Sequence, residues 1–98
     1  MDKNQVIATL KANMEKLQEF PVNALYIFGS VARDDADKSS DIDMLVEFEQ
    51  DAHIGLFGFA RLQRALSDIL SCQVDLVTPE ALHKEMKDRI LEEAVRAA

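Results

Sequence analysis

The sequence lacks the features that would assign it to a secreted or membrane-bound class. It has a single cysteine among 98 residues, so no disulfide can form within the chain, and a reducing cytoplasm is the simplest compartment. The first residues, MDKNQ, lack the basic and apolar regions of a signal peptide, and no apolar run approaches membrane-spanning length. We therefore expect a cytoplasmic protein without a membrane segment.

Basic residues are also few. Eleven lysine and arginine residues stand against 18 aspartate and glutamate residues, which gives a formal net charge of −7. A surface this acidic repels nucleic-acid phosphates, so direct binding of nucleic acid is not expected. The 48% content of apolar residues indicates a folded protein, and the length predicts a single domain covering residues 1–98.

Hydrophobic periodicity predicts alternating helices and strands. Apolar residues recur every three or four positions over 2–20, and Pro21 ends this first helix. Over 56–70 a similar stripe is formed by Leu56, Phe59, Leu62, Leu66 and Ile69. The other expected elements are strands over 24–28, 41–48 and 71–78 and a final helix from 79 to 95. Together they predict an α+β fold, in which a small mixed β-sheet of three or four strands has helices on one face and carboxylates on the other.

Two aspartates open the predicted strand over 41–48. Asp41 and Asp43 are two residues apart, so their side chains point to the same face, roughly 6 to 7 Å apart along the strand. The alternate positions are apolar and predict a core-facing side: Ile42, Met44, Val46 and Phe48. Paired carboxylates repel each other without a cation, and Mg²⁺ prefers one or two carboxylates together with phosphate oxygens and water. The pair therefore indicates a site for a metal-bound nucleotide phosphate.

Gly29 and Ser30 follow the preceding strand and supply the other half of this candidate site. A glycine at a strand end lets the backbone approach a ligand closely, and the short helix that follows presents unpaired N–H groups to an anion. The Ser30 hydroxyl adds a further donor. Arg33 lies one helical turn later, where two roles fit it: binding of phosphate, or an ion pair that holds the loop.

A third aspartate, Asp75, interrupts the apolar strand over 71–78. An aspartate inside such a strand is uncommon and costly unless it is paired. Two interpretations stay open at this point. Asp75 forms a salt bridge to a basic residue such as Arg33, or it is a third metal ligand that helps to deprotonate an acceptor hydroxyl.

The acidic loop before Asp41 offers a rival interpretation. Alternate residues from Asp35 to Asp43 (Asp35, Asp37, Ser39, Asp41 and Asp43) match positions 1, 3, 5, 7 and 9 of an EF-hand calcium loop. The template then fails, because Ser40 replaces the glycine at position 6 and Val46 replaces the glutamate at position 12. A solvated acidic loop before an ordinary strand is the remaining plain alternative.

The chain resembles the polymerase-beta-like nucleotidyltransferase superfamily in one spacing: Gly29-Ser30, ten intervening residues, then Asp41-Ile42-Asp43. It is most similar to the minimal nucleotidyltransferases, or MNT domains, and its later segment VDLVTPEALHKEMKDRILEEAV is similar to their closing strand and helix. The resemblance implies their fold and ATP as substrate. It assigns phosphate binding to Gly29 and Ser30, and the position of Arg33 makes it a further candidate for this role. Catalysis and the binding of two Mg²⁺ ions fall to Asp41, Asp43 and Asp75.

Proteins similar to this chain are antitoxins of HEPN/MNT toxin–antitoxin pairs. The resemblance implies a metal-dependent protein adenylyltransferase that transfers AMP from ATP to a tyrosine of a cognate HEPN ribonuclease toxin and so neutralises it. An acidic surface suits a basic, RNA-binding partner. Two alternatives stay open: an antitoxin that inhibits its partner by binding alone, and the catalytic subunit of a small-molecule, antibiotic-type nucleotidyltransferase.

Overall fold

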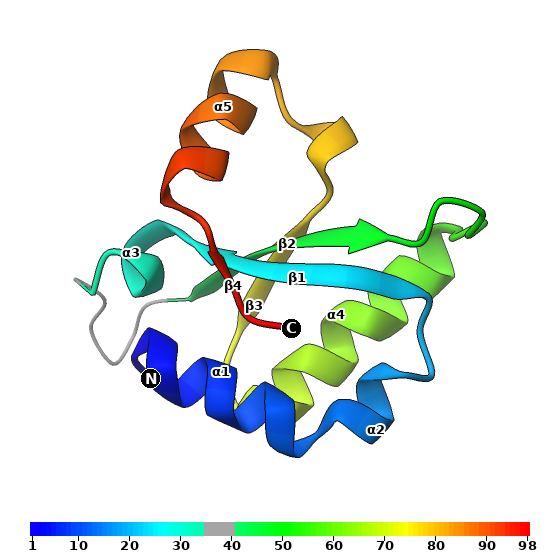
Figure 1. Cartoon of the computed structure of the whole chain (residues 1–98). Helices are drawn as coiled ribbons and strands as arrows, with labels where there is room; N and C mark the ends of the chain where they lie inside the picture. The colour runs from blue at the N-terminus through cyan, green and yellow to red at the C-terminus, as the bar shows by residue number, and fades with distance from the viewer. Residues whose placement is uncertain (35–40) are drawn as a thin grey trace.

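The computed structural model describes residues 1–34 and 41–98 (Figure 1). Its elements, in chain order, are α1 (Lys3–Ala12), α2 (Met14–Leu17), β1 (Val22–Phe28), α3 (Gly29–Ala32), β2 (Ile42–Phe48), α4 (Leu56–Leu70), β3 (Val74–Val77), the 3₁₀ helix η1 (Pro79–Ala81), α5 (Lys84–Glu93) and β4 (Val95–Arg96). The calcium ligands of the rival interpretation at Asp35, Asp37 and Ser39 lie outside the described residues. Because β2 is extended where an EF-hand would lead into its second helix, the described part of that segment does not fit the calcium template.

The four strands form one mixed sheet in the order β3-β2-β1-β4. β1 pairs antiparallel with both β2 and β4, whereas β2 and β3 run parallel. A parallel pair needs a crossover connection, and α4 supplies it between β2 and β3. The predicted α+β fold with a small mixed sheet is confirmed.

The helices lie on both faces of the sheet. α1, α2 and α4 cover one face, the lower one in Figure 1, and their apolar side chains form a core with the strands. α5 stands over the opposite face, close to α3. The expectation that helices occupy one face therefore describes three of these helices but not α5. The chain returns from η1 to the free edge of β1, and it crosses the face that the other helices leave open.

The first helix forms as predicted at its start but ends early. The Asp2 carboxylate accepts from Gln5 N at 2.8 Å, and the Gln5 side chain accepts from Asp2 N at 3.0 Å, which completes a capping box. The helix stops at Ala12, because the Asn13 side chain donates to the carbonyl of Thr9 and Asn13 leaves helical geometry. The predicted helix over 2–20 is therefore two helices, α1 and α2.

The last segment also differs from the single helix predicted over 79–95. Pro79 begins only a short 3₁₀ turn, and α5 starts at Lys84 and ends at Glu93. The chain then becomes extended, and Val95 pairs with Ile27 of β1. This fourth strand gives the exposed edge of β1 a partner, which removes a row of unpaired backbone groups.

The crossover helix α4 has the predicted bounds, and its stripe is buried at Leu62, Leu66 and Leu70. Leu56, assigned to the same stripe from the sequence, is instead 80% exposed, and its neighbour Phe57 is 83% exposed. Periodicity places a residue on a helix face, but it does not show how far the neighbouring elements extend over that face. None of the helices in residues 1–34 and 41–98 is long and apolar enough to cross a membrane.

The substitution Leu62→Ala should lower the free energy of unfolding by about 2 to 5 kcal/mol, because it leaves a cavity in the fully buried core. Leu56→Ala makes the same chemical change on the same helix at an exposed position, and it should cost less than about 0.5 kcal/mol. Urea unfolding followed by circular dichroism measures both. Equal losses in the two variants would contradict this packing.

Candidate active site

The site lies where β1 passes directly into the short helix α3. Gly29, the first residue of α3, has a φ of +74°, a conformation that residues with a side chain rarely adopt. A Cβ atom at this position would collide with the Asp43 carboxylate of β2, and it would lie 3.1 Å from the Asp43 Cγ. Only a glycine allows the turn to lie this close to the aspartate.

The sheet register places the carboxylates beside this turn. Asp43 is the antiparallel partner of Phe28, the residue before Gly29, and it is also the parallel partner of Asp75 on β3. Neighbouring strands are about 4.8 Å apart, so Asp43 and Asp75 lie side by side. Asp41 is exposed and immediately precedes β2. The register thus places Asp43 next to the turn and Asp75 beside it, and Asp41 lies just before the start of β2.

The electrostatic environment of Asp43 is unfavourable to its charged form. Burial is the largest cause that raises the pKa of Asp43, followed by the like charges of Asp75 and Asp41. The Arg33 guanidinium acts in the opposite direction, and Glu93 adds a further small rise. Asp75 is exposed, and within residues 1–34 and 41–98 no ion pair of Asp75 is found, so the salt bridge considered for it from the sequence is not formed there.

These carboxylates match the chemistry of a hard divalent cation. All three offer oxygen ligands, and a cation beside Asp43 would offset the repulsion that raises its pKa. No three acidic, histidine or cysteine side chains of the described residues are positioned as a complete metal-binding group. Mg²⁺ commonly takes only one or two carboxylates from the protein, and the phosphate oxygens of a bound nucleotide supply further ligands.

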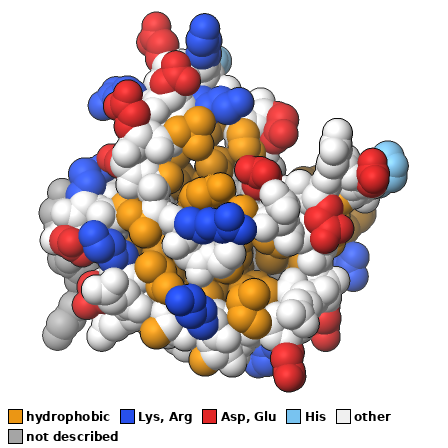
Figure 2. All heavy atoms as spheres, in the orientation of Figure 1, with side chains coloured by type: hydrophobic (Ala, Val, Ile, Leu, Met, Phe, Trp, Pro, Cys, Tyr) orange, Lys and Arg blue, Asp and Glu red, His pale blue; other side chains and the backbone are white. Residues whose placement is uncertain are grey.

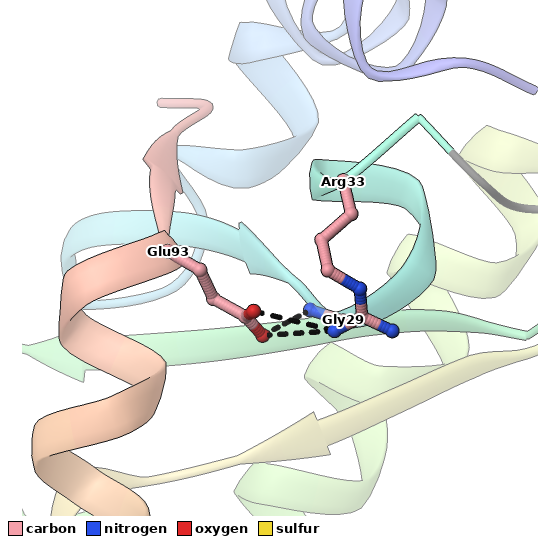
Figure 3. Close-up of polar contacts among 3 residues, drawn as sticks. All are labelled: Gly29, Arg33 and Glu93. Carbon is pink, nitrogen blue, oxygen red and sulfur yellow. Dashed lines mark hydrogen bonds and ion pairs between the residues drawn. The ribbon is translucent and has the colours of Figure 1, made fainter.

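An acidic residue that the sequence did not single out lies directly on the turn. Glu93, the last residue of α5, accepts a hydrogen bond from Gly29 N–H at 3.0 Å through Oε1. Its Oε2 lies 3.2 Å from Arg33 Nη1, which forms an ion pair (Figure 3). Arg33 is therefore in an ion pair across the site.

One signal in the sequence could have identified Glu93. The predicted final helix carries Glu92 and Glu93 near its C-terminal end, and α5 has no basic residue in its last turn. The negative end of the helix dipole disfavours acidic residues there. Such a local conflict indicates that a partner elsewhere in the fold compensates for it, and here the partners are Gly29 and Arg33.

A cavity of about 650 Å³ opens between this turn and α5. Gly29, Ser30 and Asp43 line one side of it, and Met86 and Arg89 of α5 line the other. Figure 2 shows apolar side chains gathered on the surface between α5 and the sheet. The cavity thus combines backbone and hydroxyl donors, a carboxylate and an apolar wall, a combination typical of small-molecule sites.

The chain is similar to known proteins over most of its length. The nucleotidyltransferase domain family matches the chain over residues 7–97. The chain is 34% identical over 92 residues to protein adenylyltransferase MntA of Thermococcus cleftensis. This alignment covers 93% of this chain and 91% of that protein. It is 45% identical over 69 residues to MJ0435 of Methanocaldococcus jannaschii, assigned as a protein adenylyltransferase, over 70% of this chain and 72% of the relative.

Solved structures show the same fold. A structure assigned as a minimal nucleotidyltransferase superposes with a TM-score of 0.80 at 34% identity, covering 97% of this chain and 95% of that one. A crystal structure of a toxin–antitoxin with AMP-PNP superposes with a TM-score of 0.69 at 20% identity, covering 100% of this chain and 73% of that one. The second similarity concerns the fold alone.

Gly29→Ala should destabilise the protein by about 2 kcal/mol or more, because the new methyl group requires a strained φ and displaces the Asp43 carboxylate. Gly55→Ala is the matched control: Gly55 has a φ of −82°, and a Cβ there meets no atom within 4 Å. Its effect should stay within about 0.5 kcal/mol, since the lost entropy of the unfolded chain offsets the weaker N-cap. Chemical unfolding measures both, and a tolerated Gly29→Ala would contradict the close approach.

Asp43→Asn should raise the Tm of the metal-free protein at pH 7. Because folding raises the pKa of Asp43, the folded state binds this proton more strongly than the unfolded chain does. The resulting stability is fully present below the ordinary aspartate pKa of 3.8 and is lost as the pH rises through the raised pKa. The difference between variant and wild type should therefore be largest at pH 7 and vanish near pH 3.

Thermal unfolding in EDTA at the two pH values tests this expectation. Asp51→Asn removes the same charge from an exposed turn and serves as the control. A Tm of Asp43→Asn that falls at pH 7 would show that the charged carboxylate stabilises the fold.

Proposed function

This chain belongs to the nucleotidyltransferase domain family, and on that premise we propose that it is a metal-dependent protein adenylyltransferase that acts as an antitoxin. In this proposal it transfers AMP from ATP to a tyrosine hydroxyl of a cognate HEPN ribonuclease toxin and so neutralises the toxin. The observation that carries the proposal is the close approach of Gly29 to Asp43, with Asp75 beside it on the neighbouring strand.

The turn and the aspartates have distinct roles in the proposed reaction. Gly29 and Ser30 bind the nucleotide phosphates through the backbone N–H and the hydroxyl group, and Arg33 is the candidate for a further phosphate contact. Asp41, Asp43 and Asp75 would hold the metal. Mg²⁺ is the proposed ion, because it prefers carboxylate and phosphate oxygens as ligands. When bound, the metal neutralises phosphate charge and lowers the barrier to displacement.

The chemical step is an in-line displacement at the α-phosphorus of ATP. The acceptor oxygen forms a bond to that phosphorus, and the bond to the leaving pyrophosphate breaks. The proton of the acceptor hydroxyl moves to a carboxylate, for which Asp75 is the candidate because it is exposed beside Asp43. Positioning and charge neutralisation provide most of the rate enhancement.

A protein acceptor is supported by the relatives. MntA of Thermococcus cleftensis is a protein adenylyltransferase by name, and the chain covers 91% of its length. A solved complex of similar fold, with a TM-score of 0.59, contains a tri-AMPylated HEPN toxin of Shewanella oneidensis with its MNT antitoxin. The net charge of −7 suits docking on a basic, RNA-binding partner in the cytoplasm.

Incubation of the cognate HEPN partner with this protein, ATP and Mg²⁺ should add one or more AMP units to the partner. Asp43→Asn should slow the reaction at least about 10²-fold, because it removes a charge that the transition state requires. The Asp41→Asn/Asp43→Asn double variant should abolish it. Intact-mass analysis measures the adduct, and peptide mapping identifies the modified residue.

The same experiment distinguishes the alternatives. A partner that is bound and inhibited without any gain in mass would identify an antitoxin that acts by contact alone. Turnover of a free small molecule, such as an antibiotic, in the absence of a protein acceptor would identify a small-molecule nucleotidyltransferase. Asp51→Asn, in an exposed turn away from the site, should leave the transfer rate unchanged.

A further inference from the structure

The Glu93 carboxylate contacts two groups that the proposed function assigns to phosphate binding: the N–H of Gly29 and the guanidinium of Arg33. Its Oε1 accepts from Gly29 N–H at 3.0 Å, and its Oε2 lies 3.2 Å from Arg33 Nη1 (Figure 3). The second contact of Arg33 Nη1, to Oε1, measures 3.4 Å. One carboxylate thus bridges the backbone of the turn and the side chain that follows it by one helical turn.

A phosphate oxygen and Glu93 cannot accept from Gly29 N–H at the same time. A good N–H···O hydrogen bond places its acceptor 2.7–3.2 Å from the nitrogen and close to the N–H direction. Glu93 Oε1 already holds that position. An incoming phosphate must displace the carboxylate, because two anions that close together repel each other strongly.

The charge balance of the site also favours removal of Glu93 when a nucleotide enters. Asp75 and Asp41 already act on Asp43 as like charges, and Glu93 adds to them, whereas Arg33 acts in the opposite direction. Glu93 therefore neutralises the guanidinium while it adds negative charge beside the carboxylates. We call the arrangement with Glu93 bound to Gly29 and Arg33 the closed state. A triphosphate that approaches the closed state meets more negative charge and less available positive charge than it would if Glu93 had moved away.

The position of Glu93 in the chain permits such a movement. It is the last residue of α5, and Ala94 after it is already extended. Within α5 only Ile90 is buried, and Met86 and Leu91 are about half exposed, so little packing holds the helix in place. Rotation of the Glu93 side chain removes the carboxylate from the turn and leaves the pairing of β4 with β1 in place.

We propose that Glu93 is an autoinhibitory anion, which closes the site by binding Gly29 and Arg33 and which must swing away before ATP binds. The inference rests on the proposed function, since it takes the same turn as the phosphate-binding element. It adds a regulatory step: a change that draws the C-terminal end of α5 away from α3 increases the affinity for nucleotide.

Titration calorimetry with AMP-PNP and Mg²⁺ on the full chain tests this proposal without any transfer reaction. If the closed state holds about 90% of the molecules, it weakens the apparent affinity about tenfold. Glu93→Gln keeps the shape of the side chain but loses the ion pair with Arg33, and it should bind AMP-PNP up to about tenfold more tightly. Glu93→Ala removes both contacts and should bind at least as tightly as Glu93→Gln.

Glu85→Gln provides the matched control, because it removes one negative charge from an exposed position of the same helix. Its affinity should equal that of the wild type. Unchanged or weaker binding by both folded Glu93 variants would overturn the proposal and make Glu93 a brace that organises the turn. Absence of binding in every variant would also overturn it, whereas the proposed function is judged separately by the mass gain of the partner.

Discussion

The close approach of Gly29 to Asp43 is the constraint on which the site depends. The left-handed backbone of Gly29 brings the start of α3 against the carboxylate, and no side chain fits between them. A backbone donor and a metal-binding candidate are thereby fixed next to each other by the β1–β2 pairing. The core beneath, formed by strand residues such as Ile27 and Met44, keeps this register fixed.

Charge is the main energetic cost of this arrangement. Burial and two neighbouring aspartates raise the pKa of Asp43, so the site opposes folding at neutral pH when no cation is present. Arg33 offsets part of this cost, and Glu93 in turn pairs with Arg33. The site therefore has negative charge at the aspartates and a backbone donor with the Arg33 guanidinium at the turn, which is complementary to the metal-bound nucleotide of the proposed function.

The C-terminal segment completes the sheet and also contacts the candidate site. β4 covers the free edge of β1 through the pairing of Val95 with Ile27, and α5, directly before it, brings Glu93 to Gly29. α5 itself has one buried residue, Ile90, and it also contacts α3. A movement of α5 would therefore change the contacts of Glu93 with Gly29 and Arg33, where the proposed phosphate contacts lie.

The sequence by itself determined the local parts of this protein. Alternating apolar residues located β2 and predicted that Asp43 lies on the face away from Ile42 and Met44. Helical periodicity gave the bounds of α4, and the Gly29-Ser30 turn with its two aspartates indicated the family. These patterns depend on neighbours only a few residues apart, and such neighbours are visible in a linear chain.

The tertiary structure alone decided the long-range features. The sequence did not show that the last residues form β4, that α5 stands on the carboxylate face, or that Leu56 remains exposed. It also did not show that Glu93 meets Gly29, 64 residues earlier in the chain. Each of these outcomes depends on which surface is left open after the other elements have packed, and no local pattern contains that information.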